Sequence, residues 1–80
     1  MNSGKMLAAL QLMDERLLLD AMDALERSGI PCGSEEVNSL RTEHLPEWVQ
    51  PGSGGWLLFV EEDRYEEAME FLGDLMGYEP

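Results

Sequence analysis

Basic residues are scarce in this chain of 80 residues. It has 5 Lys and Arg against 17 Asp and Glu, so its formal net charge is −12. Affinity for nucleic-acid phosphates comes mainly from Lys and Arg, and the charge balance therefore argues against duplex DNA or RNA as a ligand. An anionic membrane surface is disfavoured for the same reason.

Cysteine and histidine are nearly absent, because Cys32 and His44 are the single examples of each. One cysteine excludes an internal disulfide framework and a cysteine-rich zinc site, and it fits a reducing cytoplasm. No metal-ligand spacing such as HxH or CxxC occurs, so we expect neither a metal nor a cofactor. A nucleophilic Cys32 would need His44 as its base. A small apolar strand residue is the simpler interpretation of Cys32, and we expect no enzyme activity.

Long apolar runs are also missing. The longest cover residues 6–10 and 56–60, five residues each, whereas a transmembrane helix needs about 20. The N-terminus shows no basic segment followed by a long apolar core, as a secretory signal would. The length and the 44% hydrophobic content fit one small domain. We expect it to span residues 5–77, with short tails at 1–4 and 78–80.

Two segments have the apolar spacing of helices. The first follows Asp14, a good N-cap, and stops at Gly29, Ile30 and Pro31; its predicted apolar face consists of Leu17, Leu18, Ala21, Met22, Ala24 and Leu25. The second is expected from about 64 to 76, with Asp63 and Glu66 as a capping pair and Gly77 as its end. Its predicted inner stripe consists of Ala68, Phe71, Leu72, Leu75 and Met76.

Two further segments read as strands. Residues 55–60 are apolar on both faces, which is typical of a central strand with cover on both sides or with a partner. Residues 30–36 contain Pro31 and Gly33, so they fit an edge strand. Residues 6–13 are ambiguous, because their helix-favouring composition competes with a role as a strand leading into the first helix. A strand here would leave Asp14 at the helix cap, and we favour that alternative.

The connection over residues 37–53 is long for so small a domain. It is not purely polar, and a short helical turn could dock on the core through Val37, Leu40, Leu45, Trp48 and Val49. The glycine-rich residues 52–55 precede a strand and lack the lysine of a phosphate-binding loop, so they are best interpreted as a flexible approach to that strand.

Two stretches carry a resemblance to a known family. They are residues 14–31, DERLLLDAMDALERSGIP, and residues 56–68, WLLFVEEDRYEEA. Together with Asn38 after the second strand, they resemble small bacterial domains described as prokaryotic signal-transducing proteins, whose biochemical function is unknown. The resemblance covers roughly residues 6–76.

The resemblance implies a ferredoxin-like α+β two-layer sandwich, related in shape to small trimeric regulators of nitrogen metabolism. Its order would be β-α-β, a long loop, then β-α, with a three-stranded sheet and both helices on one face. The spatial order of strands would be first, third, second. The first strand would then form an open edge that can pair with another chain.

Function is expected to lie in protein–protein contact, either with a partner or with a second copy through the first strand. The candidate interaction surface consists of Leu10, Asn38, His44, Trp48 and Trp56. Tryptophan is enriched at binding hot spots, although in a small domain it more often fills the core. The alternative is a metabolite sensor, with the long loop closing over a small molecule beside the sheet.

Overall fold

The computed structural model describes residues 5–76 of the chain. Within this range lie β1 (Met6–Leu12), α1 (Glu15–Arg27), β2 (Cys32–Glu36), β3 (Trp56–Glu61) and α2 (Tyr65–Met76), with 3-10 turns at Val37–Ser39, Thr42–His44 and Glu62–Arg64. The predicted order of elements is confirmed. Neither described helix has the length and apolar character needed to cross a bilayer. The predicted tails at 1–4 and 78–80, and the helix end at Gly77, lie outside the described residues.

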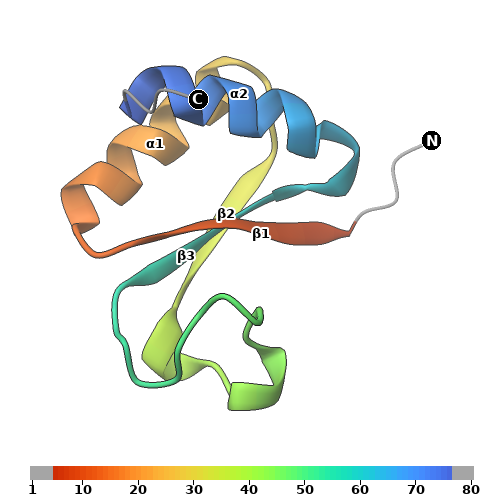
Figure 1. Cartoon of the computed structure of the whole chain (residues 1–80). Coiled ribbons are helices and arrows are strands. Elements are labelled where there is room, and N and C mark those ends of the chain that lie inside the picture. Colours follow the sequence, from red (N-terminus) through yellow and green to blue (C-terminus); the bar gives the residue numbers. More distant parts are fainter. Residues whose placement is uncertain (1–4, 77–80) are drawn as a thin grey trace.

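The three described strands form one antiparallel sheet in the spatial order β1-β3-β2. Because β1 and β2 each pair antiparallel with β3, they run parallel to each other on either side of it, as in a split β-α-β unit. Both helices lie against one face of this sheet, and the connection between β2 and β3 extends from the other side (Figure 1). The predicted α+β class, the central position of β3 and the edge position of β2 are confirmed.

The ambiguous segment at the N-terminus is a strand. β1 pairs with β3 along its length, and the register shifts between Ala8 and Leu10. The shift marks a β-bulge at Ala9, which places one extra residue in β1. Ala9 and Leu10 both pack into the core under the helices. Tertiary pairing therefore overrides the helix-favouring composition of this segment.

Both predicted ends of the first helix are confirmed. Asp14 has an extended backbone, and its carboxylate accepts a hydrogen bond of 2.8 Å from the backbone N–H of Arg16. At the other end Gly29 adopts a φ of +76°, a left-handed conformation that suits glycine. The N–H of Ile30 then donates to the carbonyl of Leu25 at 2.9 Å, and the side chain of Ile30 is buried.

The main core lies between the helices and the sheet. Leu58 and Val60 of β3 are fully buried there, together with residues from both helices: Leu18, Ala21, Leu25, Ala68 and Leu72. Two predicted core positions are wrong, because Leu17 and Leu75 are exposed. Each lies on the flank of its helical stripe, on the side that faces solvent.

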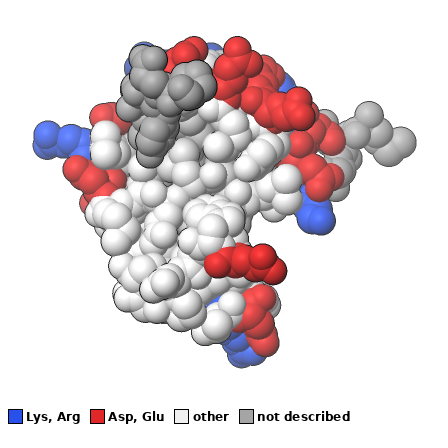
Figure 2. Space-filling view, in the orientation of Figure 1, with Lys and Arg blue, Asp and Glu red and all other residues white. Residues whose placement is uncertain are grey.

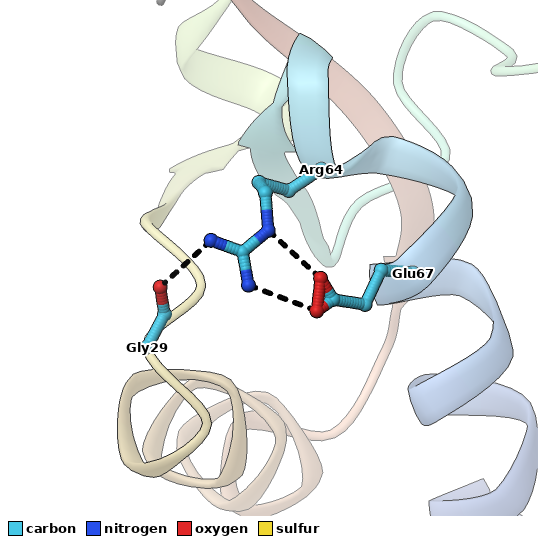
Figure 3. Close-up of polar contacts among 3 residues, drawn as sticks. All are labelled: Gly29, Arg64 and Glu67. Carbon is cyan, nitrogen blue, oxygen red and sulfur yellow. Dashed lines mark hydrogen bonds and ion pairs between the residues drawn. The ribbon is translucent and has the colours of Figure 1, made fainter.

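A 3-10 turn precedes α2, and this shifts the start of the helix from the prediction. Asp63 lies inside the turn, so it is not the residue next to the first helical position. Arg64 occupies that position, and its Nε and Nη2 donate to the two carboxylate oxygens of Glu67, both at 2.8 Å. Its Nη1 also approaches the carbonyl oxygen of Gly29 at 3.5 Å. Arg64 thus links the start of α2 to the end of α1 (Figure 3).

Candidate interaction site

Residues 37–55, which we call the loop lobe, cover part of the sheet face that lies opposite the helices. Val37 and Val49 are buried there against Leu57 of β3, and further residues pack around them: Leu40, Leu45 and Phe59. The prediction that this connection docks on the core is confirmed for four of its five apolar positions. Trp48 is the exception, because 54% of its surface is exposed.

The loop lobe is closed at its base by a backbone hydrogen bond and is attached to the edge strand β1 by one side chain. At its base, the N–H of Val37 donates to the carbonyl of Gly55 at 3.0 Å. From β1, the side-chain amide of Gln11 donates to the carbonyl of Gly54 at 2.7 Å and to the hydroxyl of Ser53 at 2.9 Å. These contacts hold the lobe over one end of the sheet and leave the other end uncovered.

The uncovered end of this face holds an open groove of about 340 Å³, lined by Met6, Gly33, Ser34, Glu35 and Phe59. Phe59 supplies its apolar floor and Met6 an apolar wall, and 38% of the surface of Met6 is exposed. In Figure 2 the molecule is hollowed between the sheet and the loop lobe, below the right-hand end of β1. Most of the surface around the hollow is uncharged, with both acidic and basic side chains at its margins.

Strand register accounts for the floor of the groove. Phe59 pairs with Gly33 on β2 and with Ala8 on β1. Cross-strand partners lie on the same face of a sheet, so the ring of Phe59 has only small neighbours at its sides. A Cβ atom built on Gly33 would meet nothing within 4 Å. The missing side chain at Gly33 therefore leaves the space beside Phe59 open.

The electrostatic character of the groove is negative. Glu35 is the one charged residue among those that line it. Glu61, two positions after Phe59 and paired with Met6, lies on the same face and is 8% exposed. Most of the few basic residues already contact acidic partners, in the pairs Lys5–Glu62, Arg27–Asp23, Arg41–Glu43 and Arg64–Glu67. The groove thus presents an apolar centre beside the carboxylate of Glu35, and no Lys or Arg is among the residues that line it.

The five residues predicted as an interaction surface fall into two groups. Leu10 and Trp56 are partly buried and pack against the core under the helices. Asn38, His44 and Trp48 are exposed on the loop lobe. The structure therefore brings three of the five onto one lobe and places the other two on the opposite side of the sheet.

The residues with potential for nucleophilic chemistry are not arranged for it. Cys32 is half-buried, and its thiol lies 3.7 Å from the carbonyl oxygen of Met22 as a donor. Burial, and secondly the charge of Glu26, raises the pKa of the Cys32 thiol, which disfavours the reactive thiolate. His44 is exposed, 3.9 Å from Glu43. Across residues 5–76, no three His, Cys, Asp or Glu side chains are grouped to hold a metal ion.

Sequence reasoning did not identify the residues that line the groove. The signal was present in β3, which is apolar on both faces. With both helices on the face of Leu58 and Val60, the alternate residues Leu57 and Phe59 need other cover. A glycine within a strand, such as Gly33, often marks a place where a ligand or another backbone approaches closely.

Comparison with known proteins gives no relative: no family model, no curated protein and no solved structure matches this chain. The function of the chain is therefore inferred from the geometry of its sheet face.

Proposed function

We propose that this chain is a regulatory domain that acts by binding another protein through the sheet face opposite its helices. One observation carries the proposal: the loop lobe covers this face around Leu57 but leaves the groove beside Phe59 open. An apolar depression rimmed by polar residues is typical of an interaction site. The binding residues in this proposal are Met6, Gly33, Glu35 and Phe59.

From the resemblance to prokaryotic signal-transducing domains we further propose that the role is regulatory and non-catalytic and that the chain acts in a bacterial cytoplasm. The strand order β1-β3-β2, with both helices on one face, supports the proposal that the fold is a ferredoxin-like two-layer sandwich. Fold alone is weak warrant for function. The groove is therefore the main support for the binding role.

A pull-down with matched methionine variants tests this function. Met6 and the residue just after β1, Met13, are both exposed, but only Met6 lines the groove. Immobilised wild type, Met6→Ser and Met13→Ser would be incubated with a lysate of the source cells and washed at high salt. We expect wild type and Met13→Ser to retain the same protein and Met6→Ser to lose most of it. Retention of no protein, or equal retention by Met6→Ser, would contradict the proposal.

A metabolite sensor is the second candidate, favoured by the groove volume of about 340 Å³. Small-molecule pockets commonly span roughly 300–1,000 Å³, so the groove is at the lower limit of that range. Its open shape fits a side chain better than an enclosed metabolite. A thermal-shift scan of a metabolite panel distinguishes the two candidate functions. A compound that raises the Tm of wild type but not of Met6→Ser would favour the metabolite sensor.

A further inference from the structure

We propose that the groove takes a segment of the partner protein in which an apolar side chain is flanked by Lys or Arg. This inference rests on the proposed function and specifies the chemistry of its partner. The apolar side chain would lie beside Phe59, in the space left by Gly33. The flanking Lys or Arg would contact mainly Glu35.

The apolar side chain of the proposed segment is inferred from the shape of the groove. Phe59 stands between Gly33 and Ala8 in the sheet, and Met6 closes the groove on the side of β1. A branched or linear aliphatic side chain that enters beside the ring would bury both its own surface and that of Phe59. Desolvation of an aromatic residue in a small depression is a common source of binding energy at protein interfaces.

The flanking Lys or Arg of the proposed segment is inferred from the negative charge of the groove and of the whole chain. Glu35 lines the groove and Glu61 lies on the same face, while the whole chain carries a net charge of −12. Complementary charge speeds association and selects the partner. A second copy of this chain would bring a further −12 to the interface, so like-charge repulsion disfavours it as the occupant. The groove therefore fits a basic segment of a different protein.

Two substitutions separate the shape of the groove from its charge. Gly33→Val would fill the floor without changing any charge, because the added Cβ meets nothing within 4 Å and the φ of Gly33 is not in the positive range. Glu35→Gln would remove one charge and keep the shape. Glu47→Gln is the matched control, since Glu47 is an exposed glutamate of the loop lobe outside the groove lining.

The probes are two fluorescent peptides of nine residues, each with a central leucine, flanked by two lysines in one and by two glutamates in the other. Binding is measured by fluorescence anisotropy at two salt concentrations. We expect wild type and Glu47→Gln to bind the lysine peptide equally and to bind the glutamate peptide at least tenfold more weakly. We expect Gly33→Val to weaken binding of the lysine peptide at least tenfold, and Glu35→Gln to weaken it several-fold.

Equal affinity of wild type and Gly33→Val for the lysine peptide would overturn the inference, because binding would then depend on net charge alone. Failure of wild type to bind the lysine peptide would also overturn it. Either failure leaves the proposed function standing if the pull-down still retains a protein that depends on Met6. If the pull-down retains none, the proposed function itself fails.

Discussion

Phe59 of β3 lies directly opposite Gly33 of β2 in the antiparallel sheet. A large aromatic side chain and a residue with none thus face the same side of the sheet as cross-strand neighbours. The usual partner of an aromatic residue in such a pair is another aromatic or a β-branched residue, which stabilises the sheet by contact. Gly33 has no side chain to make this contact, and the groove remains open beside Phe59. The stability lost at Gly33 is therefore an expected cost of keeping the groove open.

The first prediction is that Gly33→Val stabilises the fold. Glycine inside a regular element costs roughly 0.5–1 kcal/mol relative to alanine, and a β-branched residue suits a strand better still. The new side chain meets no atom within 4 Å of its Cβ and would cover Phe59. For a domain of this size we expect a rise in Tm of a few degrees, measured by circular dichroism. A fall in Tm would mean that the space beside Phe59 is not open.

The second prediction is the opposite response at another glycine. Gly55 has a φ of +75°, and a Cβ there would lie 2.5 Å from the carbonyl oxygen of Leu12. Both the backbone conformation and the backbone contact oppose a side chain. Gly55→Ala should lower the free energy of unfolding by about 1–3 kcal/mol, measured by urea denaturation. Unchanged stability would contradict the close approach of Gly55 to the backbone of Leu12.

The third prediction concerns the start of α1. The carboxylate of Asp14 accepts a hydrogen bond from the N–H of Arg16 at 2.8 Å. Asp14→Ala should cost about 0.5–2 kcal/mol, as loss of an N-cap usually does, whereas Asp14→Asn should keep most of the stability. Asp20→Ala, at an exposed position within α1, removes the same charge and serves as the control. Equal effects at positions 14 and 20 would argue against the cap.

The fourth prediction is a specific contribution to acid sensitivity from the pair in Figure 3. The hydrogen bonds from Arg64 lower the pKa of Glu67 below its ordinary value. A carboxylate with a lowered pKa in the folded state contributes stability above its unfolded pKa and loses it as the pH falls through the folded pKa. The contribution should therefore fade below a pH of about 4.5.

The check is a series of Tm measurements from pH 7 to pH 3. Glu67→Gln should reduce the drop in Tm at the acid end relative to wild type, and Glu66→Gln, at the neighbouring exposed position, should reduce it less. The effect is small because the pair is exposed to solvent. Identical profiles for the two variants would show that the contact with Arg64 does not persist in solution.

Much of the fold could be predicted from local signals in the sequence. The cap at Asp14, the stop at Gly29 and the apolar run of β3 each depend on a few adjacent residues, and each lies where it was expected. The strand at residues 6–12 could not be predicted from its composition, which favours a helix. The position of Asp14 as a cap decided that choice, and pairing with β3 supplies the energy.

The candidate site could be predicted only in part, because it arises from register. That Gly33 lies opposite Phe59 depends on the pairing of segments more than 20 residues apart, which no local pattern encodes. Trp48 was expected both as a docking residue and as an interaction candidate, and its 54% exposure fits only the second, since its spacing from Val49 and Leu45 does not reveal how a short irregular loop turns. The prediction that β3 has cover on both faces is correct at Leu57, which the loop lobe buries, but the open part of that face beside Phe59 was not predicted.

The most direct test of the binding account is a map of backbone amide chemical shifts of the labelled protein during titration with the lysine-flanked peptide. The account predicts that the largest changes fall on Gly33, Ser34, Glu35 and Phe59, and that they saturate with a single binding constant. It also predicts that the exposed acidic faces of α1 and α2 change little. Changes that are spread over the helices, or that follow the density of acidic residues and leave Gly33 and Phe59 unaffected, would contradict it.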